Sequence, residues 1–469
     1  MNFLDRSDEL ERLMRLSRSR AGGLAVVYGR RRVGKTRLLL EWVRTAGGSY
    51  SVADQSSADI QRRYFAETLE SHLPGFAEVE YPDWRSLLNR LAREASRLGW
   101  RGPVVLDEVP YLVISSPEFP SVLQRWLDHE GREARLALAI AGSSQRMMQG
   151  LVLSRDAPIY GRATEILEIN PLPPRYLEEV LPDMTTSEVA AAFAAFGGVP
   201  RYWELLVRER GSLASRIDRL VLDPLGTLHR EPDRLLLEEI PSATELRPLL
   251  DAIGGGAHRL SEIAGRVGYA ATSLSRPISR LVEMGLVRRE IPFGEPEKKG
   301  KRSLYRIADP FIRLWFRVVS PHRAQLALAT PAERRALLDR YWKALAAEGW
   351  EDLCRICLHE VSAIRPSGRA GSWGVASRWW RGNAPEWDLV ACSMDGKHLL
   401  LGESKWSARP VAVSTLEALA RELSAKPLPA LPARYADCEI HRALFVPALK
   451  KPARSKGGIR IVTSKMLLR

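Results

Sequence analysis

Two features are missing from this chain of 469 residues: long apolar runs and a cysteine framework. No apolar run approaches the ~20 residues that a membrane-spanning helix needs, and the charged start at Asp5 and Arg6 is unlike a secretory signal. Only four cysteines occur. The Cys354-x-x-Cys357 pair has no second pair and lies among apolar residues of an expected helix, which favours buried thiols over a zinc or redox site. We therefore expect a protein of the reducing cytoplasm, with no membrane partner.

Acidic residues are outnumbered as well. Lys and Arg total 70 against 56 Asp and Glu, which gives a formal net charge of +14. An excess of this sign favours a polyanionic partner, nucleic acid first and an anionic membrane second. A solvated arginine-rich surface without a partner is the alternative. At about 100–200 residues per domain, the length predicts three or four domains.

The most informative stretch is a Gly-x-x-x-x-Gly-Lys-Thr motif at residues 29–36. An apolar strand is expected before it at 24–27 and an amphipathic helix after it, the context in which this motif binds phosphate rather than forming an unrelated tight turn. Lys35 is expected to reach the β- and γ-phosphates of ATP, and the Thr36 hydroxyl to hold Mg²⁺. The predicted nucleotide-binding residues are Gly29, Arg30, Arg31, Arg32, Val33, Gly34, Lys35 and Thr36.

A second apolar strand, expected at 103–106, ends in Asp107 and Glu108. Carboxylates at the carboxyl end of a parallel strand lie where ligands of such folds bind. We expect Asp107 to hold Mg²⁺ through water and Glu108 to orient or deprotonate the attacking water. Strands often end in acidic turns, but the phosphate loop earlier in the chain favours the catalytic interpretation.

Two further groups are candidates for phosphate contacts. Ser143 and Ser144 follow an apolar strand, where a hydroxyl could touch the γ-phosphate or the water, although an ordinary turn fits nearly as well. Arg162 is a candidate arginine finger or phosphate sensor, with a structural ion pair as the alternative.

The middle of the chain predicts helices. Residues 172–220 are expected to be helical, with a lid hinge at 197–202. Three helices between 246 and 285, followed by strands at 286–291 and 303–307, predict a winged helix. Its third helix would present Ser275, Arg276, Ser279 and Arg280 to a DNA duplex, and its wing the basic turn at 298–302. A protein-contact module with a solvated basic turn is the alternative.

The last part of the chain contains Asp388 and, 15 residues later, Glu403-x-Lys405. This spacing is that of a PD-(D/E)XK nuclease site, in which Asp388 and Glu403 would hold Mg²⁺ and Lys405 would polarise the water. Glu351, on an expected helix, could complete the metal shell. Structural pairing of the acids with the lysine is the alternative, and the basic tail at 450–469 suits a surface that follows phosphates.

Taken in order, short motifs along the chain resemble the archaeal-type P-loop ATPases of the AAA+/STAND superfamily. These motifs are residues 3–10, 29–36, 106–108, 142–144, 158–162, 197–202 and 309–316. The part from Arg378-Trp379-Trp380 through Glu403-Ser404-Lys405 looks like the restriction-endonuclease-like domain that accompanies them. One departure is Asp5, where the family usually carries glycine. The resemblance implies ATP binding and slow, switch-like hydrolysis, and it fixes no biological substrate.

We thus expect an α/β multidomain protein. The predicted parts are a P-loop ATPase core at 1–170, a helical lid at 171–225, a winged helix-turn-helix at 226–325 and a restriction-endonuclease-like domain at 326–469. The leading hypothesis is an ATP- and Mg²⁺-dependent switch that binds DNA and carries a nuclease site. A non-nucleolytic regulator and an ATPase acting on protein partners are the alternatives, and the sequence leaves homo-oligomer formation open.

Overall fold

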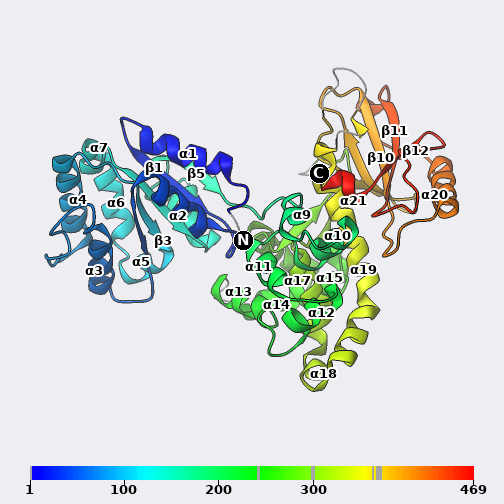
Figure 1. Ribbon diagram of the computed structural model, residues 1–469, viewed down its shortest axis with the longest axis horizontal. Helices are drawn as coiled ribbons and strands as arrows, with labels where there is room; N and C mark the ends of the chain where they lie inside the picture. Colours follow the sequence, from blue (N-terminus) through cyan, green and yellow to red (C-terminus); the bar gives the residue numbers. More distant parts are fainter. Residues whose placement is uncertain (1–2, 240–242, 297–301, 362–363, 366–371, 469) are drawn as a thin grey trace. The chain divides into compact units, whose positions relative to one another are not determined.

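The computed structural model describes residues 3–239, 243–296, 302–361, 364–365 and 372–468 (Figure 1). Contacts within the chain divide it into two compact units, Met1–Leu172 and Pro173–Arg469, called unit 1 and unit 2 below. This division lies close to the predicted end of the ATPase core at 170. The finer predicted boundaries at 225/226 and 325/326 remain predictions.

Unit 1 contains a five-stranded sheet in the order β2-β3-β4-β1-β5, in which every pair of neighbours is parallel. This arrangement is typical of P-loop ATPases. Its strands are β1 (Gly23–Tyr28), β2 (Ser49–Val52), β3 (Val104–Asp107), β4 (Ala137–Gly142) and β5 (Ala163–Glu168). Its helices are α1 (Ser7–Arg18), α2 (Lys35–Ala46), α3 (Ala58–Leu69), α4 (Trp84–Leu98), α5 (Val109–Ser115), α6 (Phe119–Asp128), α7 (Glu130–Ala134) and α8 (Gln145–Met148).

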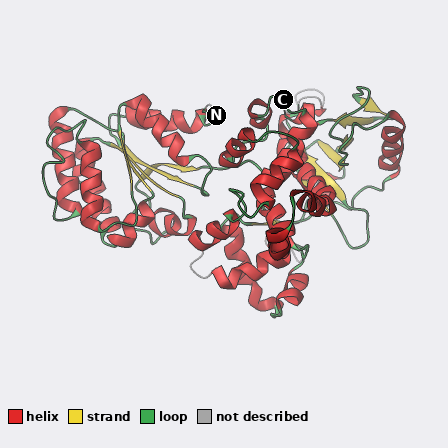
Figure 2. Cartoon of the chain, turned by 60° about the horizontal axis from the view of Figure 1, so that its bottom comes forward, coloured by secondary structure: helices red, strands yellow, loops and turns green. Residues whose placement is uncertain are grey.

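Helices cover both faces of this sheet (Figure 2). Successive side chains of a strand point to opposite faces, so alternate residues of β1 enter different cores. Ala25 and Val27 pack with Trp42 of α2 and with α1, whereas Leu24 and Val26 pack with α3 to α6. Both faces are buried, which explains why β1, β3 and β4 are continuous apolar runs rather than alternating patterns.

Helix α19 of unit 2 runs for 27 residues and packs against α10, α12, α17 and α21. The described residues of unit 2 include a set of α-helices. They are α9 (Tyr176–Val180), α10 (Thr186–Phe196), α11 (Pro200–Arg208), α12 (Leu213–Ile217), α13 (Glu231–Glu239), α14 (Ala243–Gly254), α15 (Leu260–Val267), α16 (Ser275–Glu283), α17 (Pro310–Leu314), α18 (Arg323–Leu328), α19 (Pro331–Cys357), α20 (Val413–Ala425) and α21 (Ser464–Leu467). A Cβ atom on Gly349 of α19 would lie 2.3 Å from the Ala194 Cβ of α10. The glycine therefore permits the close approach of these two helices.

Helices α14, α15 and α16 are followed by an antiparallel hairpin of β6 (Val287–Glu290) and β7 (Leu304–Ile307). The elements expected of a winged helix are thus present in the expected order. Pro277 is the third residue of α16, where a missing N–H costs no helical hydrogen bond. The predicted basic turn at 298–301 lies outside the described residues, while its last member, Arg302, pairs with Glu295 at 2.5 Å.

The chain ends in a six-stranded mixed sheet in the order β12-β13-β11-β10-β9-β8. Strands β8, β9 and β10 form an antiparallel meander, α20 then crosses over, and β11 runs parallel to β10. The strands are β8 (Ser377–Trp379), β9 (Trp387–Cys392), β10 (His398–Ser404), β11 (Glu439–Phe445), β12 (Ser455–Lys456) and β13 (Ile459–Val462). Leu416, Ala420 and Leu423 of α20 cover one face of this sheet.

Candidate functional site

The loop between β1 and α2 has a backbone that demands glycine at two places. Gly29 has φ 146° and Gly34 has φ 100°, and a Cβ atom on Gly29 would lie 2.3 Å from the carbonyl oxygen of Ile169. Arg32 also takes a positive φ, 68°. The loop leads directly into α2, whose first N–H groups have no helical partner and form a ready anion site.

Lys35 is buried at the first position of α2. Its Nζ donates to the carbonyl oxygens of Gly29 at 2.8 Å and Arg30 at 3.1 Å. The ammonium group is therefore held across the loop, in the place where the predicted role requires it to meet phosphate oxygens.

Thr36 and Asp107 come together although 71 positions separate them in the chain. The Thr36 hydroxyl donates to Asp107 Oδ2 at 2.8 Å, and the Tyr50 hydroxyl donates to the same oxygen at 2.7 Å. Mg²⁺ binds oxygens at about 2.0–2.1 Å in an octahedron, whose adjacent ligands lie about 2.9 Å apart. The hard oxygen donors and their spacing fit this ion.

Glu108 lies beside Ser143, as the order of the strands requires. Because β4 lies between β1 and β3, its carboxyl end lies between the phosphate loop and the acidic pair. The Ser143 hydroxyl is 2.8 Å from Glu108 Oε1 and its N–H donates to Oε2 at 3.2 Å. Glu108 has φ 53°, a strained value for a residue other than glycine. Ser144 instead lies at the start of α8, with its Oγ 3.5 Å from the Met147 N–H nitrogen.

Arg162 is not brought to this site within its own chain. It directly precedes β5, and Ala163 pairs with Leu24 near the amino end of β1, whereas the phosphate loop follows Tyr28. Leu24 and Tyr28 are four residues apart along the strand, a distance of about 13 Å. Arg162 instead forms a bidentate pair with Asp128, at 2.9 and 2.8 Å. The structure thus contains the ion pair of Arg162 with Asp128 and not a contact of Arg162 with the phosphate loop. A role of Arg162 as an arginine finger toward another molecule remains a prediction.

Sequence reasoning missed two residues of this site. Tyr50 contacts Asp107 from β2, and burial, with the nearby Asp107 carboxylate, raises the pKa of its hydroxyl well above the ordinary value. Arg6 is buried and donates to the carbonyl oxygen of Val33 at 3.3 Å. Tyr50 has no motif of its own, and Arg6 lies in the family motif at residues 3–10 without an assigned role. Each becomes relevant only when the neighbouring elements are placed.

Asp388 and Glu403 gather at the carboxyl end of β10. The antiparallel register pairs Leu389 with Gly402, so Asp388 and Glu403 stand opposite each other one position further on. Asp388 Oδ2 accepts hydrogen bonds from the N–H and hydroxyl of Ser404, at 2.9 and 3.2 Å. The pair predicted from spacing is thus adjacent in space.

Two lysines neutralise Glu403. Lys405 Nζ lies 2.9 Å from Oε2, and Lys426, which sequence reasoning missed, contacts Oε1 and also lies over the Trp387 ring at 4.6 Å. Burial alone would lower the pKa of Lys405, but the Glu403 and Asp388 carboxylates outweigh burial and raise it. Lys405 is therefore a cation that faces both acids.

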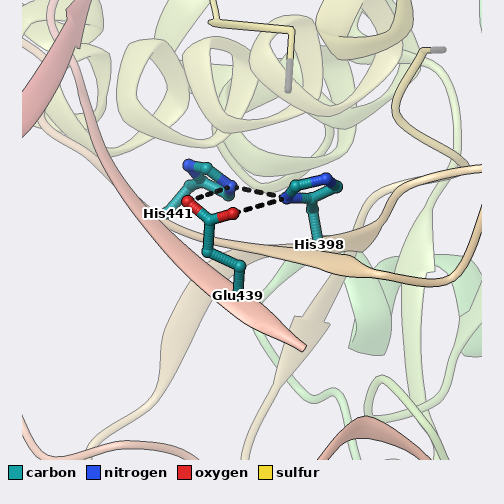
Figure 3. A group of neighbouring side chains, drawn as sticks. All are labelled: His398, Glu439 and His441. Carbon is teal, nitrogen blue, oxygen red and sulfur yellow. Dashed lines mark hydrogen bonds and ion pairs between the residues drawn. The ribbon is translucent and has the colours of Figure 1, made fainter. Parts of the chain in front are cut away.

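The predicted metal shell of Glu351, Asp388 and Glu403 is not assembled. The oxygens of these three described residues do not all lie within 4.8 Å of one another. Among the residues that the structure describes, one group of potential ligands meets that limit: His398, Glu439 and His441, at the amino ends of β10 and β11 (Figure 3). Sequence reasoning did not single out this group.

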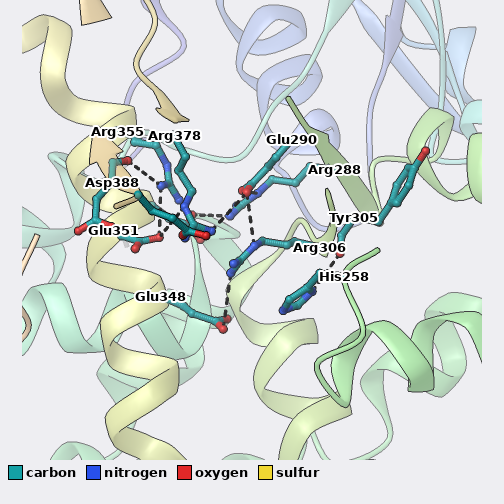
Figure 4. A network of polar contacts seen from close by, with 12 residues as sticks. His258, Arg288, Glu290, Tyr305, Arg306, Glu348, Glu351, Arg355, Arg378 and Asp388 are labelled. Carbon is teal, nitrogen blue, oxygen red and sulfur yellow. Dashed lines mark hydrogen bonds and ion pairs between the residues drawn. The ribbon is translucent and has the colours of Figure 1, made fainter. Parts of the chain in front are cut away.

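Glu351 is engaged elsewhere, in a buried network of charges between α19, the β6–β7 hairpin and the terminal sheet (Figure 4). Its Oε2 lies 3.2 Å from Arg355 Nη1 and 3.9 Å from Arg378 Nε. Arg355 also donates to the carbonyl oxygen of Asp388, at 3.2 Å. Burial raises the pKa of Glu351 despite the two arginines, with the Asp388 carboxylate adding to the rise.

The centre of this network is Asp352, which is buried beside Glu351 on α19. Its carboxylate meets Arg288 of β6 at 2.6 Å, Arg313 of α17 at 2.8 Å and Arg355 at 2.8 Å. Burial alone would raise the pKa of Asp352, but these arginines outweigh burial and hold it well below the ordinary value. The hairpin is thus joined to α19 by buried ion pairs as well as by the chain.

Helix α16 presents the polar face that the sequence predicts. Ser275, Arg276 and Ser279 are exposed and Arg280 is half-buried. The side chains of Arg276 and Arg280 make no hydrogen bond or ion pair with any described residue. Two guanidinium groups on this helix are therefore available to an anionic partner.

Within the described residues, none of the helices combines the length and apolar character needed to cross a bilayer. Cys354 and Cys357 are buried and unpaired in α19, and burial raises the pKa of Cys357 to about 12. These thiols are inert at neutral pH.

Two sequence families match the chain. Residues 3–206 match an ATPase domain found predominantly in archaea, and residues 315–418 match a family of archaeal and bacterial proteins of unknown function. An uncharacterised protein of Methanocaldococcus jannaschii is 28% identical over 414 residues, which cover 86% of this chain and 87% of that protein. A Walker-type ATPase of Pyrococcus abyssi superposes with a TM-score of 0.50 at 18% identity, over 67% of this chain and 96% of the other. That likeness shows a shared fold.

Proposed function

We propose that this chain, whose residues 3–206 form an archaeal-type ATPase domain, is an ATP-hydrolysing switch that acts on nucleic acid. The observation that carries the hydrolytic part is the arrangement around Asp107 and Glu108. Thr36 lies 2.8 Å from Asp107, and Ser143 lies 2.8 Å from Glu108, at one edge of one sheet. Both carboxylates are thus held in place by hydroxyl donors of the same site.

Each residue has a distinct role in this proposal. Lys35 leaves the carbonyl oxygens of the loop and neutralises the β- and γ-phosphates. Thr36 and Asp107 hold Mg²⁺, which supplies charge neutralisation at the phosphoryl oxygens when bound. Glu108 accepts a proton from the attacking water, and Ser143 keeps its carboxylate oriented by two hydrogen bonds.

The nucleic-acid part of the proposal is supported by α16. A helix preceded by two others and followed by a hairpin is the element that such modules place in a DNA groove. Here that helix carries exposed Arg276 and half-buried Arg280, both without partners among the described residues. The formal net charge of +14 favours the same class of partner.

Duplex binding across a salt series tests this part. Arg276→Ala combined with Arg280→Ala should weaken binding and reduce the slope of log affinity against log salt by about two, because two phosphate contacts are lost. Arg340→Ala, an exposed arginine on α19, is the matched control and should leave both quantities unchanged. Equal slopes for the double variant and the wild type would remove α16 as the nucleic-acid surface and favour a module for protein contact.

A second candidate function is metal-dependent cleavage of nucleic acid at the terminal sheet. It is favoured by the pairing of Asp388 with Glu403 beside Lys405, on an antiparallel meander with a crossover helix. Both oxygens of Glu403 contact a lysine, so Mg²⁺ would compete with Lys405 and Lys426 for this carboxylate. The restriction-endonuclease-like assignment rests on this site.

Incubation with Mg²⁺ or Mn²⁺ and a panel of duplex DNA, single strands and RNA tests the second function. Cleavage that disappears in Lys405→Ala and persists in Lys397→Ala, an exposed lysine in the turn between β9 and β10, would support it. Absence of cleavage on every substrate, with and without ATP, would leave a non-nucleolytic regulator.

A further inference from the structure

Two histidines and a glutamate meet on one face of the terminal sheet, at its end opposite to Glu403 and Lys405. His398 begins β10, Glu439 begins β11 and His441 follows two positions later, so the parallel register places Glu439 beside His398 and His441 beside Leu400. Leu399 and Leu401 face the core under α20. The histidines therefore face away from that core, and Figure 3 shows the three side chains pointing toward one another.

The distances between the facing atoms lie within about 0.3 Å of the edges of a tetrahedral metal site. His398 Nδ1 lies 3.0 Å from His441 Nε2 and 3.3 Å from Glu439 Oε2, and His441 Nε2 lies 3.6 Å from Glu439 Oε1. Zinc binds imidazole nitrogen and carboxylate oxygen at about 2.0–2.2 Å, so neighbouring ligands of a tetrahedral ion lie about 3.3–3.5 Å apart. A small movement of side chains would bring all three donors to one ion.

The two imidazoles are largely enclosed by the protein. The side chains of His398 and His441 are 14% and 10% exposed. The Trp373 ring meets His441 edge to face at 5.8 Å between centroids and restricts that imidazole.

We propose that His398, Glu439 and His441 form a zinc site that joins the amino ends of β10 and β11. Two imidazoles and one carboxylate select a transition metal, whereas Mg²⁺ prefers oxygen donors alone. The 67% exposure of the Glu439 side chain gives the ion an entry path and leaves a fourth position to water. The site is separate from the Asp388–Glu403 cluster, since five residues of β10 span about 17 Å.

The structural consequence is a cross-link between two strands that the chain connects only through the long α20 crossover. In the unfolded chain, 40 positions separate His398 from Glu439 (residues 399–438). An ion that binds only the folded arrangement shifts the folding equilibrium of unit 2 toward its folded state. Zinc should therefore raise the thermal stability of unit 2 without the participation of ATP.

The test uses the full chain without a histidine tag, stripped with chelator and then titrated with Zn²⁺. The wild type should retain one ion per chain that His398→Gln, His441→Gln and their combination lose, with affinity falling at least ~10-fold for each single change. His359→Gln, which alters an exposed histidine, and Cys392→Ser with Cys438→Ser are the controls and should retain the ion. Circular dichroism verifies that each variant is folded.

Replacement of zinc by Co²⁺ provides a second readout, because the visible absorption of a tetrahedral cobalt site should appear in the wild type and the controls only. An excess of Mg²⁺ should not displace either ion. Equal metal content in the wild type and the His398→Gln, His441→Gln double variant would overturn the proposal. Absence of binding to the wild type would do so too, leaving a hydrogen-bonded group of side chains only.

Discussion

At the scale of single residues, Asp107 and Glu108 have different surroundings although they are adjacent. Asp107 Oδ2 accepts hydrogen bonds from Thr36 and Tyr50, so it is fixed by two hydroxyl donors. Glu108 contacts Ser143 and adopts a strained backbone angle of φ 53°. The surroundings of Asp107 suit a fixed ligand of a cation, and those of Glu108 suit a group that exchanges a proton. Substitutions can therefore test the two roles separately.

Substitutions at the two ends of this site should therefore have different effects. Lys35→Ala should abolish ATP binding measured by calorimetry, because the ammonium that neutralises the phosphates is gone. Glu108→Gln should leave ATP binding within a few-fold of the wild type and reduce phosphate release by about 10²–10⁴-fold, the usual contribution of a general base. Unchanged turnover in Glu108→Gln would assign the base to another residue, and unchanged affinity in Lys35→Ala would remove the nucleotide site.

At the scale of elements, α19 is the helix on which the charge network depends. It contributes Asp352, which meets Arg288 of the hairpin and Arg313 of α17, and Glu351, which meets Arg355 and Arg378. Arginine is well suited to such sites because its planar group makes several directed hydrogen bonds and stays charged. Removing one partner leaves the others buried without compensation.

Asp352→Asn should thus lower the free energy of unfolding of unit 2 by about 3–5 kcal/mol, measured by denaturant titration. Because the pKa of Asp352 is held well below its ordinary value, its stabilising contribution is full above about pH 4 and is lost as the pH falls below that value toward the folded-state pKa. The difference in the free energy of unfolding between the variant and the wild type should therefore become smaller as the pH falls below about 4.

Asp339→Asn is the matched control, because Asp339 is exposed on the same helix. Its effect should stay within about 0.5 kcal/mol at every pH. A cost for Asp352→Asn that equals that of the control, or that grows as the pH falls, would show that the network does not stabilise the unit.

The same elements show which parts of the sites could be predicted from the sequence. Gly29 to Thr36, Asp107 and Glu108 could be assigned because local patterns fix a strand, a turn and a helix in sequence. Arg162 could not be placed, because its distance from the phosphate loop depends on how β5 pairs with β1. Glu351 was assigned to a metal shell as a carboxylate on an expected helix, while its partners are Arg355, one helical turn away on α19, and Arg378 of β8. The pairing with Arg378 joins residues that are far apart in the chain. Non-local pairings of this kind have no local signal.

At the scale of the whole molecule, the chain has two units whose cores are separate sets of residues. The residues of the proposed nucleotide site belong to unit 1, on or beside α1, β1, α2, β2, β3 and β4. Helix α16, the charge network and the histidine group belong entirely to unit 2.

Thermal unfolding should separate these units into two transitions, because each unit has its own buried core. ATP with Mg²⁺ at about 100 times its Kd stabilises only the unit that binds it, by about 2.7 kcal/mol, so the transition of unit 1 should rise by about 5–10 °C. Lys35→Ala should remove this rise, and Zn²⁺ should instead move the transition of unit 2. A single transition that both ligands shift equally would mean that the two units unfold as one. Nucleotide binding would then stabilise the terminal sheet together with unit 1.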